Sequence, residues 1–374
     1  VMKWGDEQFF KSKLALNTKD TDKEYVNAED AFAHLFNKKD LSQIQEAVLW
    51  KKYSVADGVF HRLGALLASG AVDGQGPSGL SKSLVDNYLN ADGTFINPKD
   101  EKYKDFNEMF KERDARLLVT VMHSGPDCKY RASSPTNKPM NVRAYDATGT
   151  EDEMKEKNED IVSPNLNGDG NSKSVTGFHI RLGIDTTYVD NESETVVVLF
   201  RYAEGLLCYA EAAEELDLCT DDVLNKTLKP LRERAGVTYV KPTKADPNFP
   251  FTGLSPVLQE IRRERRSELA LQGFRLDDLM RWAVAGTLKG QDGRGRGAYL
   301  GEDGVLYKSF SPKGRESLKL VLKDNDGWTD PLQQYLPQGY LFDLNRDYLL
   351  PIPPDELQLN RELKQNPGWG DANE

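Results

Sequence analysis

The feature that most constrains the fold of this chain is a charged helical pattern, IRRERRSELALQGFRLDDLMRW, at Ile261–Trp282. Residues recur around it at spacings of three and four positions: Leu258, Ile261, Arg265, Glu268, Leu269 and Gln272. This spacing places them on one helical face. Arginines and glutamates surround that face at i, i+3 and i, i+4 distances. The pattern predicts two helices, the second over 276–285, that are locked together by an Arg–Glu network.

Clusters of arginine also occur in proteins that bind nucleic acid, and four of the five residues at 262–266 are arginines. Glutamates are interleaved with them, however, and the formal net charge of the chain is −11. Binding to a phosphate backbone requires a local excess of positive charge. We therefore expect no nucleic-acid partner.

A second phrase, YLLPIPPDELQLNRELKQNPGW at Tyr348–Trp369, is stiffened by prolines. Proline fixes φ and lacks a backbone donor, which predicts an extended segment up to Ile352. Pro354 suits the first turn of a helix, and Asn-Pro-Gly at 366–368 predicts a turn. The sequence therefore predicts a packed C-terminal tail, with Trp369 and also Trp282 in the core.

These two phrases resemble the C-terminal signature of the SusD/RagB family, the surface-exposed nutrient-binding lipoproteins of Bacteroidetes. Two further stretches resemble family helices in the same order, LFRYAEGLLCYAEAAEEL at 199–216 and LNKTLKPLRERAGVTY at 224–239. Upstream, SLVDNYLNADGTF at 83–95 and AHLFNKKDLSQIQEAVLWKKYS at 33–54 are also similar to family segments. The resemblance covers roughly residues 30 to 370.

The resemblance implies a mainly α fold, a SusD-like scaffold of tetratricopeptide-like helix pairs with long irregular loops and a few short strands. It implies that residues 1–374 form one domain, the C-terminal portion of a longer protein. Family members begin with a lipid-acceptor cysteine and paired helices, whereas this chain begins at Val1 and has no cysteine before Cys128. We therefore expect the N-terminal part of the family to be absent from this chain.

Local patterns predict the individual elements. Alternation and β-branched residues predict strands at 46–53 and 116–122. Apolar spacing predicts helices at 28–36, 103–110, 196–216 and 220–234. The polar, proline-containing segment at 125–177 is predicted to be a surface excursion.

No motif for catalysis is present: the sequence lacks Gly-x-Ser-x-Gly, a phosphate loop and His-Glu-x-x-His. The four histidines and three cysteines have no metal-ligand spacing, and Cys208 is expected to be a small core residue. The stretch NLNGDGN at 165–171 alternates oxygen side chains as a calcium loop does, but Thr176 stands where a bidentate glutamate is required. It is therefore interpreted as a turn, and no cofactor is expected.

Two alternatives to binding arise from the residues. The acidic pairs Asp221–Asp222 and Asp277–Asp278 supply the two carboxylates that a glycan-degrading hydrolase of helical fold needs. Arg275 and Arg281 are close in sequence to the second pair, so ion pairing is the simpler interpretation. A pure scaffold or adhesion protein is the other alternative.

The resemblance implies non-catalytic binding of an oligosaccharide, less often a peptide, and its delivery to a SusC-like TonB-dependent transporter. The location that it implies is the outer-membrane surface, with a lipid anchor in the absent N-terminal part. In the family, the loop before the Leu-Val-Asp-x-Tyr segment contributes to a shallow aromatic site. That loop is 54–79 here, without Trp or Tyr, and it supplies Phe60, His61 and Arg62. Trp328 and Tyr335 are predicted to be further exposed aromatic contacts.

Overall fold

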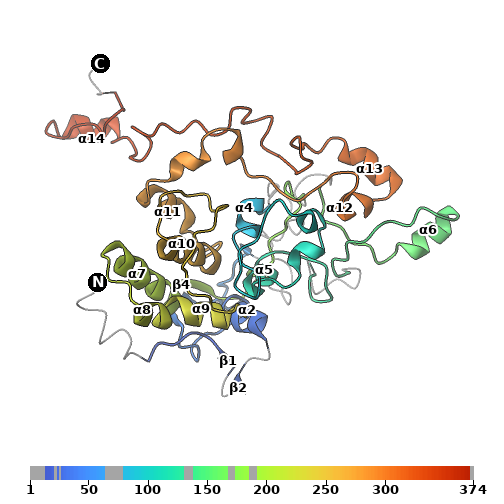
Figure 1. Ribbon diagram of the computed structural model, residues 1–374, viewed down its shortest axis with the longest axis horizontal. Coiled ribbons are helices and arrows are strands. Elements are labelled where there is room, and N and C mark those ends of the chain that lie inside the picture. The colour runs from blue at the N-terminus through green and yellow to red at the C-terminus, as the bar shows by residue number, and fades with distance from the viewer. Residues whose placement is uncertain are drawn as a thin grey trace. The chain divides into compact units, whose positions relative to one another are not determined.

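The computed structural model describes residues 13–20, 23–24, 27–63, 79–129, 138–166, 173–184 and 192–370, and it is mainly helical (Figure 1). The chain divides into two compact units. The first comprises residues up to 272 together with 296–331, and the second comprises 273–295 together with 332–374. That the two units form the single domain expected from the sequence stays a prediction.

The first unit contains most of the regular elements. Its α-helices are α2 (Ala28–Asn37), α4 (Lys82–Val85), α5 (Ala115–Thr120), α6 (Glu151–Lys157), α7 (Tyr202–Glu215), α8 (Asp221–Lys226), α9 (Leu228–Arg234), α10 (Pro256–Glu268), α12 (Val305–Lys308) and α13 (Pro312–Leu318). Two 3₁₀-helices, η1 (Glu101–Lys104) and η2 (Glu108–Phe110), occupy the segment predicted to be one helix. Its strands form two antiparallel pairs, β1 (Lys19–Asp20) with β2 (Lys23–Glu24) and β3 (Ala47–Lys51) with β4 (Val197–Arg201).

The helix predicted at 196–216 begins later than expected. Its first residues, Val197–Arg201, form β4 and pair with β3, where Leu49 lies opposite Phe200. β-Branched and aromatic residues favour this extended pairing over a helical turn. The predicted strand at 46–53 is confirmed as β3, and the predicted helix at 28–36 is confirmed as α2.

The helix predicted at 220–234 is broken in two. Pro230 has no N–H to donate to the carbonyl of Lys226, four residues earlier. In a continuous helix its ring would also clash with that carbonyl. The chain therefore leaves the helical conformation at Thr227 (φ −121°, ψ −78°) and restarts as α9. Helices α7, α9 and α10 pack against one another (Figure 1). Their pairing in tetratricopeptide fashion stays a prediction.

The strand predicted at 116–122 is wrong, because residues 115–120 form α5. The side chain of Asp114 accepts a hydrogen bond from the backbone N–H of Arg116 at 2.9 Å and so caps the first turn. Extended structure resumes only at Val121, which pairs with Ile180. A capping interaction and the burial of Arg116 thus outweigh the strand preference of the sequence.

The main core of the first unit includes Trp328, which was expected to be exposed. Only 9% of its surface is accessible, and its ring packs edge-on against Tyr299 with centroids 5.3 Å apart. The Lys82 ammonium lies 4.4 Å from the centre of the same ring. The expected exposure of Trp328 is therefore wrong.

The segment at 125–177 does not lie on the surface throughout. Met140, Val142 and Leu166 are buried in the main core, whereas α6 has no buried residue. Residues 130–137 and 167–172 lie outside the described residues, and so does most of the candidate calcium loop.

The second unit contains α11 (Arg275–Arg281), η4 (Ala285–Leu288), η5 (Gln291–Gly293) and α14 (Pro354–Leu359). Pro354 occupies the first turn of α14, as predicted. The predicted turn at 366–368 is confirmed by the hydrogen bond from the Trp369 N–H to the Asn366 carbonyl, 3.2 Å. Trp282 is buried, but Trp369 is only half-buried, so its assignment to the core is wrong. Its indole N–H donates to the Leu349 carbonyl instead, at 2.9 Å.

Candidate functional site

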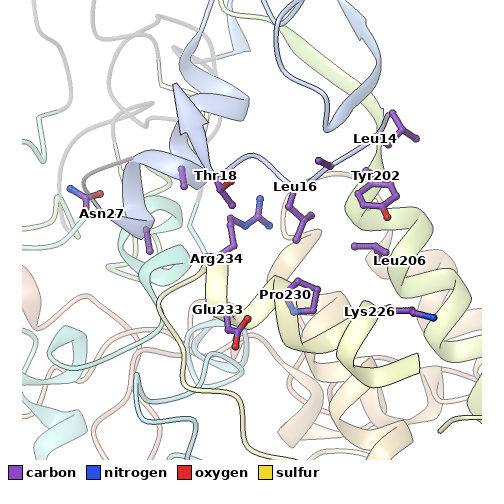
Figure 2. Close-up of a pocket in the computed structure, with 13 residues that line it drawn as sticks. Leu14, Leu16, Thr18, Asn27, Tyr202, Leu206, Lys226, Pro230, Glu233 and Arg234 are labelled. Carbon is purple, nitrogen blue, oxygen red and sulfur yellow. The ribbon is translucent and has the colours of Figure 1, made fainter. Parts of the chain in front are cut away.

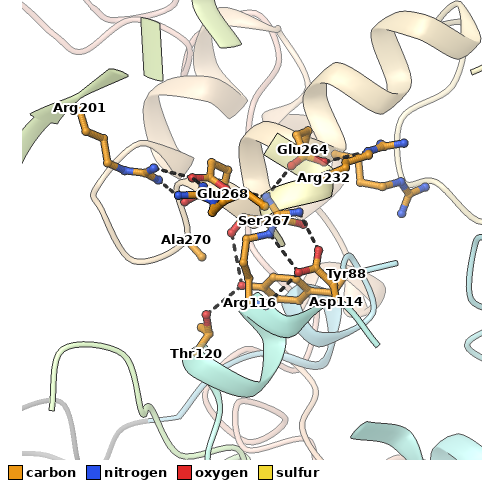
Figure 3. Close-up of polar contacts among 12 residues, drawn as sticks. Tyr88, Asp114, Arg116, Thr120, Arg201, Arg232, Glu264, Ser267, Glu268 and Ala270 are labelled. Carbon is orange, nitrogen blue, oxygen red and sulfur yellow. Dashed lines mark hydrogen bonds and ion pairs between the residues drawn. The ribbon is translucent and has the colours of Figure 1, made fainter. Parts of the chain in front are cut away.

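Three glutamates on one face of α10 form the centre of a buried ion network. Figure 3 shows the part of this network around Glu264 and Glu268. Glu260, Glu264 and Glu268 are spaced by four residues and therefore point the same way. Their partners, like the glutamates, are buried and come from four places: Arg116 on α5, Arg201 at the end of β4, Arg232 and Arg234 on α9, and Arg263 on α10 itself. We call these eight residues, with Glu46, the Arg–Glu network.

Glu268 is the most connected member of the Arg–Glu network. Its carboxylate lies 2.6 Å from Arg116 Nη1 and 2.5 Å from Arg201 Nη1, and it also binds Arg234. Glu46, just before β3, bridges Arg201 and Arg234 at 2.8 and 3.0 Å. The network was predicted, but its extent was not. It joins α10 to α5, α9 and the β3–β4 pair rather than locking two successive helices.

The network has a defined effect on stability at acid pH. Burial opposes ionisation of Glu268, but the guanidinium groups of Arg234, Arg201 and Arg116 outweigh it and lower the pKa well below the ordinary 4.5. A carboxyl group with a depressed folded-state pKa contributes stability above its unfolded pKa and loses it as the pH falls toward the folded value.

We therefore expect the free energy of unfolding to fall steadily as the pH drops below about 4.5, and the contribution of Glu268 to be complete and independent of pH near neutrality. Urea denaturation followed by circular dichroism at a series of pH values measures this. Substitution of Glu268 by glutamine should flatten the acid limb of that profile. An acid limb of the same steepness in the variant would show that other groups govern it.

The predicted ligand residues Phe60, His61 and Arg62 directly follow a hydrogen-bonded turn, in a segment that we call the Tyr53–Leu63 loop. Ser54 and Val59 exchange two backbone hydrogen bonds, of 2.7 and 2.9 Å, across the turn. The loop is joined to the segment before β4, since His61 and Ser193 exchange backbone bonds of 3.1 and 2.9 Å.

The His61 ring fixes the conformation of this loop. Its Nδ1 accepts from the N–H of Leu63 at 3.1 Å, so Nε2 carries the proton and donates to the Thr195 carbonyl at 2.7 Å. Tyr53 packs edge-on against this ring, with centroids 4.5 Å apart. Both ring nitrogens are thus used within the protein, and His61 positions the loop.

Two aromatic side chains and one guanidinium group of the Tyr53–Leu63 loop remain able to meet a ligand. Phe60 is 41% exposed, Arg62 is exposed and Tyr53 is partly exposed. Tyr53 was not among the predicted contacts, because it precedes the loop at 54–79 that the family resemblance indicated. Tyr335, by contrast, belongs to the second unit and is 80% exposed.

A hollow of about 760 Å³ lies elsewhere on the first unit (Figure 2). Its lining comes from the N-terminal segment, α2, α7, α8 and α9: Leu14, Ala15, Leu16, Thr18, Asn27, Ala28, Ala31, Tyr202, Leu206, Lys226, Pro230, Glu233 and Arg234. These segments are far apart in sequence, so no local motif predicts the hollow. Its volume is in the range of small-ligand sites.

A second hollow, of about 710 Å³, lies between the turn at 124–126 and the end of α6. The polar groups that line it largely bind each other. Lys138 pairs with Glu159 at 2.8 Å, and the Asn141 amide donates to Asp160 at 2.9 Å. Little hydrogen-bonding capacity is left there for a ligand.

Three of the four carboxylates in the acidic pairs considered for hydrolysis are ion-paired. Asp221 pairs with Lys241 at 2.6 Å, Asp222 with Lys226 at 2.5 Å, and Asp278 with Arg281 at 2.8 Å. Ion pairing therefore accounts for these carboxylates. Cys208 is exposed, with its sulfur 3.7 Å from Arg265 Nη1, and is not the core residue expected.

Two negative findings apply to the part of the chain that the structure describes. No cluster of three or more histidine, cysteine, aspartate or glutamate side chains there is arranged to hold a metal ion. Nor does any helix in that part combine the length and apolar character that a membrane crossing requires.

Comparison with known proteins identifies relatives of this chain. The model of the SusD family matches residues 43–369. The structure is similar to a SusD-like carbohydrate binding protein from Bacteroides fragilis, with 23% identity, a TM-score of 0.62, and coverage of 97% of this chain and 59% of that one. A second SusD-like protein from Bacteroides fragilis has 18% identity, a TM-score of 0.56, and coverage of 96% and 59%. This chain thus spans about 59% of the length of both. No curated protein matches it.

Proposed function

The chain belongs to the SusD family, and from that premise we propose that it is a non-catalytic protein that binds nutrient glycans. The observation that carries this proposal is the family match over residues 43–369. A solved neighbour described as a carbohydrate binding protein supports it. So does the ion pairing of Asp221, Asp222 and Asp278, three of the four acidic residues first considered for hydrolysis, because a general acid or nucleophile must be available to its substrate.

We place glycan contact on the Tyr53–Leu63 loop. Aromatic side chains bury the apolar faces of sugar rings, and an exposed guanidinium donates to hydroxyl oxygens. Phe60 and Tyr53 supply the first function and Arg62 the second. The loop is held in place before any ligand arrives, which lowers the entropic cost of binding. Tyr335 in the second unit stays a candidate contact.

The proposal includes a handover step and needs no cofactor or metal ion. A SusC-like TonB-dependent transporter would accept the glycan, and the energised step would belong to the transporter. The location would be the outer-membrane surface, with a lipid anchor outside this chain. The family resemblance is what supports these three statements.

The proposal is tested by affinity electrophoresis in gels that contain individual neutral polysaccharides, together with a reducing-sugar assay on the same polysaccharides. Retardation without release of reducing ends is the expected result. Release of reducing ends would favour a hydrolase, and the absence of retardation across a broad set would favour a scaffold. Co-purification with the transporter tests the handover separately.

A further inference from the structure

The floor of the hollow in Figure 2 holds a buried hydrogen-bond donor that has no acceptor in the described part of the chain. Arg234 is 5% exposed, and its Nη1 and Nη2 bind Glu46 and Glu268 in the Arg–Glu network. Its Nε–H is buried and finds no partner there. Figure 2 shows the Arg234 side chain in the hollow, beside Leu16 and Thr18. A buried donor without an acceptor costs about 1–3 kcal/mol, so an acceptor that enters the hollow recovers that energy.

The charges around the hollow are already balanced. Arg234 is held by two carboxylates, Lys226 pairs with Asp222 at 2.5 Å, and Glu233 lies 3.8 Å from Lys229. An anionic ligand would meet no cation that lacks a carboxylate partner among these residues, and it would lie close to Glu46 and Glu268. A neutral acceptor avoids both penalties.

The walls combine apolar surface with polar groups at the rim. Leu14, Leu16 and Pro230 are half-buried and supply aliphatic surface, whereas Leu206 and Tyr202 line the hollow but are almost fully buried. The carboxylate of Glu233 is an exposed acceptor at the rim. A sugar ring matches this arrangement, because its C–H face packs on apolar surface while a hydroxyl group both accepts and donates.

We propose that the hollow binds one or two neutral sugar units, with a hydroxyl oxygen accepting from Arg234 Nε–H and a hydroxyl group donating to Glu233. This inference rests on the proposed function, but it names a site remote in sequence from the Tyr53–Leu63 loop and a class of sugar. It predicts selection of neutral sugars over uronic acids. An alanine at position 234 would disrupt the Arg–Glu network, so rim positions provide the better test.

The experiment is isothermal titration of the folded chain with D-glucose, D-galactose, D-mannose, maltose and D-glucuronate. At least one neutral sugar is expected to bind with a Kd of about 1 mM, and glucuronate at least tenfold more weakly. Glu233→Trp places an indole over the hollow and should weaken the neutral sugar at least tenfold. Ala28→Trp blocks the α2 side and should do the same. Asn225→Trp, at an exposed position of α8 outside the lining, is the matched control and should bind as the parent does.

The outcomes separate this inference from the proposed function. If polysaccharides retard the protein but no neutral sugar binds, the hollow is not a sugar site and the proposed function still stands. The same conclusion follows if Glu233→Trp and Ala28→Trp both bind the neutral sugar as the parent does. Glucuronate binding as tight as that of the neutral sugars overturns the selectivity. Loss of both polysaccharide and sugar binding in the folded parent overturns the function as well. Circular dichroism confirms that each variant is folded.

Discussion

Replacing Glu268 by glutamine is expected to lower the free energy of unfolding by about 3–5 kcal/mol, a large part of the 5–15 kcal/mol typical of a protein domain. Glutamine preserves the shape of the side chain, so the loss comes from the charge and not from a cavity. Arg116, Arg201 and Arg234 would each lose an anionic partner while remaining buried. Denaturation in guanidinium chloride, followed by far-ultraviolet circular dichroism, measures the change.

Glu215→Gln is the matched control for this substitution. Glu215 ends α7 and pairs with Arg262 on α10 at 3.2 Å, but its side chain is 52% exposed. Arg262 is buried, but an ion pair whose carboxylate is open to solvent is screened by water and salt and contributes about 0–1 kcal/mol. We expect a loss in that range for the control. Losses of equal size in the two variants would mean that burial does not amplify the Glu268 interactions.

The sequence predicted the Arg–Glu network only in part, because several of its contacts join residues that are far apart in the sequence. The i, i+4 spacing of Glu264 and Glu268 is local and can be read directly. Arg116 lies 148 residues from Glu264 and 152 from Glu268. It stands in a segment whose β-branched residues favour a strand. Nothing local links that segment to α10, so both its helical conformation and its charged partners come from tertiary contacts.

The order of the family motifs along the chain predicted the fold more accurately than local residue patterns did. The family resemblance inferred from the C-terminal phrases is confirmed by the match over 43–369, and the mainly helical fold is confirmed by the structure. Trp328 is the opposite case. It follows the polar run KDNDG, which predicts an exposed loop. The residue after it, Thr329, donates its N–H to the Ala298 carbonyl at 3.0 Å, and this pairing turns the indole into the core.

The sequence predicted the two candidate sites, the Tyr53–Leu63 loop and the hollow beside Arg234, to different extents. The Tyr53–Leu63 loop was located through the family resemblance, because its position in the chain is enough to find it. The contact between Tyr53 and His61 required coordinates. The hollow beside Arg234 is assembled from segments around positions 14–31, 202–206 and 226–234, and its floor is a residue whose sequence context indicates only a helix end.

Phe60→Ala is expected to weaken binding of the cognate polysaccharide about tenfold to fiftyfold. A sugar that covers about 60–100 Å² of the ring gains about 1.5–2.5 kcal/mol at 25 cal/mol per Å², and each 1.4 kcal/mol is a factor of ten in Kd. Phe60 is 41% exposed, so the ring has that area to offer without a change in the loop. Affinity electrophoresis over a series of polysaccharide concentrations measures the Kd.

Val55→Ala is the control within the same loop. Val55 is 37% exposed and lies on the turn that Ser54 and Val59 close, so its truncation removes apolar surface without removing an aromatic face. We expect its effect on Kd to stay below about threefold, which corresponds to less than 1 kcal/mol. Equal weakening in the two variants would point to general apolar contact, and an unchanged Kd in Phe60→Ala would remove the loop from the glycan site. If Phe60→Ala weakens polysaccharide binding more than Val55→Ala does, while neutral sugars still bind at the hollow, then the Tyr53–Leu63 loop and the hollow make separate contacts with the ligand.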